Sequence, residues 1–172
     1  MADAPSSPGS SNGSAQTASR THQFSTFFLD GLYFGVEVLK VQELIRYQEM
    51  TRVPLAAPAV RGLINLRGQI VTAIDLRRRF DMPDRPADRL PMNAVVRIDD
   101  VAVSLLVDEI GDVVEVHDDE FERAPATIKG RATDLITGVY KMPDRLLLVL
   151  DVERAIAVSG GRAAGTTGLP GA

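Results

Sequence analysis

The chain has 172 residues, no cysteine and only two histidines, His22 and His117. Disulfide bonds, thiolate zinc sites, cysteine-ligated iron–sulfur clusters and cysteine nucleophiles are therefore excluded, and a histidine-rich metal site is disfavoured. The formal net charge of −4 argues against a dedicated nucleic-acid-binding protein, because such proteins usually carry a basic surplus.

Composition divides the chain into two tails and a folded body. Residues 1–21 are almost all Ala, Ser, Gly, Pro, Thr and Asn, and residues 159–172 are mainly Gly, Ala, Thr and Pro. Such segments bury too little apolar surface to offset their ordering entropy, so we expect both tails to be disordered. The N-terminal tail lacks the apolar stretch of a secretory signal, and no apolar run is long enough to cross a membrane. A cytoplasmic protein is therefore expected.

Alternating apolar residues dominate the body, residues 22–158, and predict an all-β fold. The alternation is clearest at 32–38 and 101–107, which it predicts to be half-buried strands. Further strands are expected at 24–29, 44–53, 60–66, 70–74, 94–98, 113–116, 135–140 and 146–150. Short strands at this spacing favour an antiparallel sandwich or small barrels over a doubly wound sheet. Asp75 and Asp151 are each suited to cap a short helix.

Comparison of the sequence with itself indicates an internal duplication. One alignment brings the apolar residues of 32–38 onto those of 101–107. A second alignment, of the parts that follow, brings glycine onto glycine and aspartate onto aspartate, at Gly62 and Gly138 and at Asp75 and Asp151. Any two alternating strands align to some degree, but the matched glycines and aspartates favour a true repeat, near 23–80 and 92–156. Because each unit is small, the two are expected to share an interface with a groove where they meet.

The sequence offers no constellation of residues for catalysis. It has no Walker A loop or G-x-G-x-x-G motif. Its G-x-S-x-G pattern, at residues 9–13, falls in the N-terminal tail rather than between a strand and a helix, and His22 lies at the edge of the same tail. His117 and the acidic run 118–122 are expected to be solvated, since the acidic spacing does not match an EF-hand. The basic run 77–79 is expected to be a solvated helix rather than a phosphate contact, because three consecutive helical residues cannot share one face. We therefore expect no enzyme, no cofactor and no metal.

One hairpin stands apart, from Arg61 to Val71, because two glycines, an asparagine and two arginines interrupt apolar strands. Gly62 within a strand suggests a bulge or a close backbone approach, and Gly68 supplies a positive φ at the turn after Asn65. Arg67 is then either a solvated arginine of an ordinary hairpin or a binding residue. An unpaired guanidinium is costly to bury, so Arg67 is expected to be partly exposed or paired with a carboxylate such as Glu43.

This hairpin, with its continuation to Arg77, resembles the signature of the CheW family of chemotaxis coupling proteins. Further similarity lies in residues 33–43, 107–113 and 135–138, in the same order and at the family's distances. The resemblance covers residues 23–158. It implies two intertwined five-stranded SH3-like β-barrels with short helices, and a non-enzymatic adaptor.

The resemblance also implies partners and a location. CheW-type proteins connect the cytoplasmic hairpin tips of methyl-accepting chemoreceptors to the regulatory domain of the histidine kinase CheA, in rings beneath receptor arrays at the inner membrane. By motif, the receptor groove is expected to include Val38, Val41, Glu43, Arg67 and Val107. Core burial is the alternative for Val38 and Val41. The loop with Arg123 and Ile128 is similar to a family loop that contacts the neighbour in the ring, although Ile128 replaces the family's usual aromatic residue.

Two other function classes make different demands on the sequence. A small β-barrel that binds nucleic acid needs a basic face with exposed aromatic rings, and this acidic chain has only three Tyr, six Phe and no Trp. An enzyme on a β scaffold needs the catalytic constellation that is missing. We therefore expect neither nucleic-acid binding nor membrane insertion.

Overall fold

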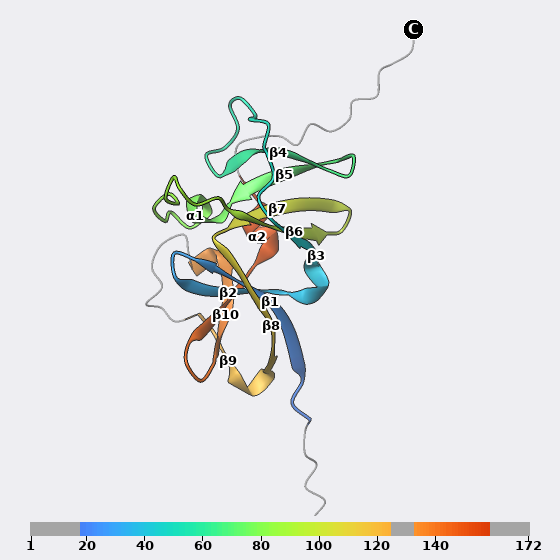
Figure 1. The fold of residues 1–172 in the computed structure, drawn as a ribbon. Coiled ribbons are helices and arrows are strands. Elements are labelled where there is room, and N and C mark those ends of the chain that lie inside the picture. The colour runs from blue at the N-terminus through green and yellow to red at the C-terminus, as the bar shows by residue number, and fades with distance from the viewer. Residues whose placement is uncertain (1–17, 125–132, 159–172) are drawn as a thin grey trace, which may run out of the picture.

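The structure is a computed structural model that describes residues 18–124 and 133–158. The two tails that we expect to be disordered, 1–21 and 159–172, lie largely outside the described residues. Thr21, the last residue of the expected N-terminal tail, is already the first residue of a strand. Figure 1 shows an upper and a lower group of strands with the two short helices near the junction. The helices are α1 (Leu76–Arg79) and α2 (Val152–Ile156). The strands are β1 (Thr21–Leu29), β2 (Leu32–Glu37), β3 (Val41–Ile45), β4 (Val60–Leu66), β5 (Gln69–Asp75), β6 (Met92–Ile98), β7 (Val101–Val107), β8 (Glu109–His117), β9 (Phe121–Glu122), β10 (Ile136–Lys141) and β11 (Leu146–Leu150).

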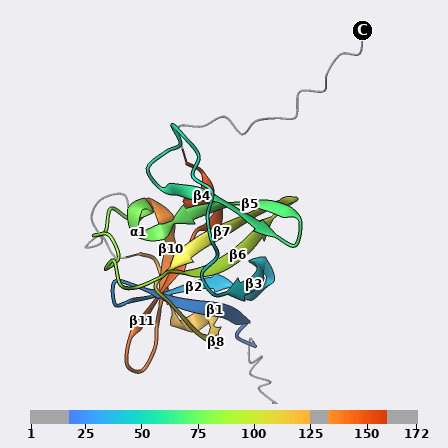
Figure 2. The same ribbon diagram turned by 45° about the horizontal axis from the view of Figure 1, so that its top comes forward.

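The strands form two sheets that exchange elements between the two halves of the chain. One sheet has the order β8-β1-β2-β11-β10-β9, and the other has the order β3-β6-β7-β5-β4. Hairpin β1–β2 of the first half therefore joins β8, β10 and β11 of the second, while hairpin β6–β7 joins β3, β4 and β5 (Figure 2). Each barrel thus contains strands of both halves, and the predicted pair of intertwined SH3-like barrels is confirmed.

The internal duplication is visible in the detailed hydrogen bonding. Under the repeat, the order β3-β6-β7-β5-β4 becomes β8-β1-β2-β11-β10, and both sheets contain one parallel pair, β5 with β7 and β11 with β2. A register shift occurs at Gly62 in β4 and at Gly138 in β10, which the sequence repeat matches to each other. The backbone N–H of Asp75 donates to the Ala59 carbonyl at 2.7 Å, and that of Asp151 donates to the Leu135 carbonyl at 2.8 Å. The two bonds are equivalent, because Asp151 follows Asp75 and Leu135 follows Ala59 by the same number of residues.

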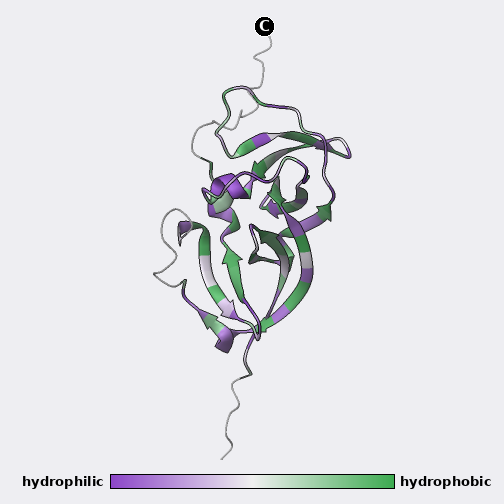
Figure 3. Cartoon of the chain, turned by 60° about the vertical axis from the view of Figure 1, so that its left-hand side comes forward, coloured by the Kyte–Doolittle hydropathy of each residue, from purple (hydrophilic) through white to green (hydrophobic). Residues whose placement is uncertain are grey.

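The central strands are buried on both faces, which corrects the expectation of half-buried strands at 32–38 and 101–107. On β2, Tyr33 packs inside one barrel while the next residue, Phe34, packs into a cluster shared by both sheets. On β7, Ala102 packs inside the other barrel, and the next residue, Val103, packs into the shared cluster. Figure 3 shows hydrophobic residues running along the strands and hydrophilic residues on α1. The second buried face exists because the two barrels pack against each other.

The strand expected at 44–53 is wrong in extent. Strand β3 begins at Val41 and ends at Ile45, and beyond it only Thr51 makes an isolated bridge, to Leu63. The reason lies in the topology, since β3 and β4 are at opposite edges of their sheet. The chain between them must cross the mouth of the barrel and cannot continue as a ladder strand.

The three arginines of α1 are structural rather than solvated, which corrects a second expectation. Arg77 is buried and donates from Nε and Nη2 to the carboxylate of Asp108, at 2.6 to 3.0 Å. Arg78 donates to the Pro58 carbonyl at 3.3 Å. Arg79 donates to three carbonyls at the end of α2, those of Arg154 at 2.7 Å, Ala155 at 2.9 Å and Ala157 at 3.2 Å. The three side chains point apart because their helical positions differ, and each therefore reaches a different part of the protein.

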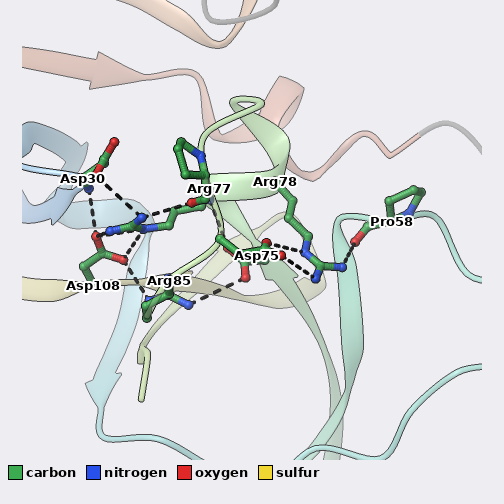
Figure 4. Close-up of polar contacts among 9 residues, drawn as sticks. Asp30, Pro58, Asp75, Arg77, Arg78, Arg85 and Asp108 are labelled. Carbon is green, nitrogen blue, oxygen red and sulfur yellow. Dashed lines mark hydrogen bonds and ion pairs between the residues drawn. The ribbon is translucent and has the colours of Figure 1, made fainter. Parts of the chain in front are cut away.

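Asp108 lies at the crossover between the barrels, immediately after β7 and before β8. Besides Arg77, its carboxylate accepts from Arg85 Nε at 2.8 Å and from the Asp30 backbone N–H at 2.8 Å (Figure 4). Its own N–H donates to Phe28 at 3.0 Å. Burial alone would raise the pKa of Asp108, but the hydrogen bonds from Arg77, Asp30 and Arg85 outweigh burial and lower it.

Replacing Asp108 by Asn should remove a pH-dependent part of the stability. Because the folded-state pKa of Asp108 is lowered, its contribution is present above the unfolded value of about 3.9 and is lost as pH falls through the folded value. We expect Asp108→Asn to lower the free energy of unfolding by about 3 kcal/mol at pH 7, since two buried arginines lose their nearest carboxylate partner. The difference from the wild type, measured by urea denaturation, should shrink below about pH 4. Asp144→Asn, in an exposed pair with Arg145, is the control, and an Asp108 difference that is constant down to pH 2 would contradict the assignment.

The two helix caps occupy equivalent positions in the repeat but should differ in energy. Asp75 accepts from the Arg77 N–H at 3.0 Å and Asp151 accepts from the Arg154 N–H at 3.1 Å, so both predicted caps are confirmed. Asp75 is also buried beside Arg85, with 3.6 Å between Oδ2 and Nη1. Asp151→Ala should cost about 1 kcal/mol, and Asp75→Ala should cost about 3 kcal/mol because it also leaves a buried guanidinium under-compensated. Chemical denaturation measures both, and equal losses would show that the contact with Arg85 contributes nothing.

Candidate protein-interaction site

The first crossover between the barrels forms one side of the candidate site. A single 3-10 turn, Val38–Lys40, carries the chain from β2 in one sheet to β3 in the other. Val38 and Val41 are half-buried, and Val41 packs against the central core cluster. Leu39 between them is 98% exposed. The turn therefore anchors its two valines while it projects a leucine into solvent.

The hairpin turn after β4 forms the other side. Leu66 pairs with Gln69, so the turn has two residues, and both have a positive φ: 52° at Arg67 and 85° at Gly68. These values define a type I′ turn, which matches the twist of the strands. Asn65 Oδ1 accepts from the Gly68 N–H at 2.9 Å and closes the turn. The positive φ predicted for Gly68 is confirmed, and Arg67 unexpectedly shares the left-handed conformation, at a cost of about 1–2 kcal/mol for a residue with a Cβ.

Gly62 allows the backbone of the crossing loop to approach the start of this hairpin. It lies at the predicted bulge in β4, and a Cβ at this position would come within 2.5 Å of the Thr51 carbonyl oxygen. Thr51 and Leu63 exchange two backbone hydrogen bonds there, at 2.8 and 2.9 Å. The predicted close backbone approach is thus present, and it ties the long crossing loop to the hairpin.

An ion pair joins the two sides of the candidate site. Arg67 Nη2 lies 2.9 Å from Glu43 Oε2, and the Arg67 side chain is 83% exposed whereas that of Glu43 is 18% exposed. Both alternatives expected for Arg67, exposure and pairing with Glu43, therefore hold together. Since β3 and β4 are the two edges of their sheet, the pair bridges the seam of the barrel. A guanidinium has five N–H donors, so Arg67 keeps donors available for a partner.

Val107 does not belong on this surface. It is 0% exposed and packs in the central core cluster, so no partner of the folded protein can contact it, which corrects the expectation that it lines the receptor groove. Val107 is the repeat equivalent of Val38, but the second crossover is held inward by the contacts of Asp108. Of the two predicted ring-contact residues, Arg123 is exposed directly after β9, and Ile128 lies outside the described residues.

Two exposed apolar residues of the site were missed by sequence reasoning. Leu39 adjoins the valines of the crossover, and Ile70, which is 62% exposed, pairs with Asn65 beside the turn. The sequence did contain a signal for Leu39. When the alternation of 32–38 is continued by one residue, Leu39 falls at a position expected to face solvent. Ile70 and Val71 are adjacent apolar residues, and the sequence alone does not show which of the two faces solvent.

Other chemistry is sparse in the part of the chain that the structure describes. No group of three histidine, aspartate or glutamate side chains there has a geometry that could hold a metal ion. His22 Nε2 lies 2.6 Å from Asp118 Oδ1 at the surface, and His117 is exposed at the end of β8. Within the same residues, no helix combines the length and the apolar character needed to span a bilayer.

Comparison with known proteins agrees with this geometry. A protein-family model described as the CheW-like domain matches residues 23–159. The chain belongs to the CheW-like domain family. Among curated CheW proteins, the chemotaxis protein CheW of Bacillus subtilis (strain 168) is 32% identical over 130 residues, which cover 76% of this chain and 83% of the relative. That of Klebsiella aerogenes is 30% identical over 135 residues, covering 78% and 81%.

The fold has a solved CheW counterpart as well. The crystal structure of the scaffolding protein TtCheW from Thermoanaerobacter tengcongensis superposes with a TM-score of 0.73 at 25% sequence identity. The match covers 83% of this chain and 97% of that one. The resemblance to CheW proteins in the sequence therefore extends through the whole β-barrel body.

The hairpin glycines of this CheW-family chain should differ in their tolerance of a side chain. At Gly68 a Cβ meets open space, so Gly68→Ala should cost about 1 kcal/mol, from the positive φ alone. At Gly62 the Cβ meets the Thr51 backbone, so Gly62→Ala should cost about 3 kcal/mol. Thermal and urea unfolding of both variants test this order. If Gly62→Ala were the milder change, the close approach of Thr51 would not be a constraint on the fold.

Proposed function

We propose that this protein is a non-enzymatic adaptor that couples the cytoplasmic hairpin tip of a chemoreceptor to the regulatory domain of the histidine kinase CheA. Membership in the CheW-like family supports the proposal, and so do relatives whose names describe a chemotaxis protein and a scaffolding protein. In this role the protein works in the cytoplasm at receptor arrays beneath the inner membrane.

The observation that carries the proposal is the exposure and conformation of Arg67. An arginine that is 83% exposed and held at a positive φ is unfavourable for folding alone, so a function in binding accounts for its presence. The segment that leads to its partner Glu43 carries the exposed Leu39 and the half-buried Val38 and Val41. An apolar surface of this kind accepts one face of an amphipathic helix, which is the chemistry of a helical hairpin tip. Glu43 and Arg67 would then set the orientation and register of the helix.

A second contact is proposed for the kinase-like neighbour in the ring. Arg123 follows β9, at the far end of the β8-β1-β2-β11-β10-β9 sheet from β8. The site of Arg67 and Glu43 is in the other barrel. Contacts on different barrels would let one protein bind receptor and kinase at the same time, as an adaptor must.

Reversing the charge of Arg67 should uncouple the protein without unfolding it. Arg67→Glu places two carboxylates at the seam, but the side chain is exposed, so we expect a loss of stability of only about 1 kcal/mol. Activation of the kinase in a reconstituted mixture with a receptor fragment should fall to background. Arg67→Lys should recover part of the activity, because a lysine cannot reproduce the planar contact of a guanidinium.

A charge-swapped variant separates binding from internal pairing. Glu43→Arg combined with Arg67→Glu restores an ion pair across the seam while it exchanges the charges that a partner meets. We expect this double variant to have wild-type stability and to remain unable to couple. Recovery of coupling in the double variant would assign the pair to the fold alone, and normal coupling by Arg67→Glu would remove Arg67 from the interface.

A further inference from the structure

A cavity of about 800 Å³ lies at the opposite end of β4 from the candidate interaction site. Its walls come from the loop that crosses from β3 to β4, from the start of β4, from α1 and from the loop that precedes β6. Arg61 lies at the start of β4 and Arg67 follows its end. A strand of this length spans about 20 Å, so the cavity is distinct from the surface around Arg67.

The cavity concentrates positive charge in a chain whose net charge is −4. Five arginines and two aspartates line it, which gives the cavity a net charge of +3. The two aspartates are already neutralised, since Asp84 pairs with Arg78 at 3.1 Å and Asp75 lies 3.6 Å from Arg85. The other three arginines have no ion-pair partner among the described residues: Arg52, Arg61 and Arg89.

A second observation is an incompletely hydrogen-bonded arginine in the wall of the cavity. The Arg85 side chain is only 8% exposed, and its Nη2 is buried without a hydrogen-bond partner in the described part of the chain. An unsatisfied donor of a buried charged group costs more than an ordinary hydrogen bond gains, so such atoms are rare and usually have an explanation. Arg85 Nη2 is itself enclosed by protein, so the wall of the cavity contains a guanidinium whose hydrogen bonding is incomplete.

The remaining surface of the cavity suggests the size and character of the ligand. A volume of about 800 Å³ is within the range of small-molecule sites and is too small for a folded partner. Tyr47, Val53 and Leu90 add exposed ring and apolar surface around the arginines. Guanidinium groups bind phosphate oxygens through paired, charge-assisted hydrogen bonds.

We propose that this cavity is a binding site for a small phosphate-bearing anion with two or more phosphate groups. Arg52, Arg61 and Arg89 contact the phosphate oxygens, and Arg85 supports the site from the wall. Tyr47 and the apolar rim face any organic part of the ligand. The site is distinct from the surface around Arg67, and its ligand binding can be tested on the isolated full chain.

Isothermal titration calorimetry with magnesium-free ATP and with pyrophosphate tests the proposal. We expect ATP to bind, with an affinity that falls as sodium chloride rises from 50 to 300 mM, as a site of several cations requires. Equal affinity for pyrophosphate would show that the site recognises phosphate alone, and tighter binding of ATP would show that Tyr47 and the rim contribute. Absence of binding by both probes at millimolar concentration would overturn the proposal.

Two double variants with the same loss of charge provide the matched control. Arg61→Gln with Arg89→Gln should weaken ATP binding at least about tenfold, because charge-assisted hydrogen bonds are removed from the site. Arg20→Gln with Arg97→Gln, both exposed and outside the cavity, should leave it unchanged. Equal loss in the two double variants, or binding of an oligoglutamate peptide but not of ATP, would also overturn the proposal. If the cavity double variant does not fold by circular dichroism, Arg52→Gln alone replaces it in the same comparison.

Discussion

Asp108 stands where the chain leaves one barrel for the other, and its carboxylate receives two guanidinium groups and a backbone N–H. Each donor comes from a different element: Arg77 from α1, Arg85 from the loop before β6, and Asp30 from the turn of the β1–β2 hairpin. An acidic side chain at 16% exposure is tolerated only with such partners. By binding them all, Asp108 holds the two barrels in one orientation, and every surface made by both barrels depends on that orientation.

The duplication supplied two equivalent crossovers, and the chain uses them differently. The second is closed, with Val107 in the core and Asp108 fixed by arginines. At the position equivalent to Asp108, the first crossover has Leu39, which is 98% exposed. One difference between the repeats, Asp108 against Leu39, thus separates a crossover fixed by ion pairs from a crossover that exposes an apolar side chain. The two crossovers keep equivalent places in the backbone fold but differ in the side chains that they carry.

Local features of the fold could be predicted because their causes are local. The Gly68 turn, the Gly62 bulge and the two aspartate caps follow from the conformational limits of a few neighbouring residues. The burial of Val107 agrees with the alternation of 101–107, and only its assignment by motif to the receptor groove is wrong. The burial of Arg77 could not be predicted, because it depends on the parallel pairing of β5 with β7 and on a carboxylate distant in the sequence. The Arg67–Glu43 pair could be expected because an arginine needs a carboxylate partner. The gathering of arginines around the cavity could not be predicted, because they come from separate segments whose spacing in the sequence shows no pattern.

The exchange of strands between barrels also constrains how the protein is made. Strand β2 has β1 and β11 as neighbours, and β11 ends at Leu150, so the barrel that contains β2 cannot be completed until β11 has left the ribosome. Until then β2 presents an open edge, which is a hazard for association with other chains. Because each barrel needs strands of both repeats, a genetic rearrangement could not transfer one repeat alone as a folding unit. A gene that encodes this architecture is therefore inherited, fused or lost as a single piece.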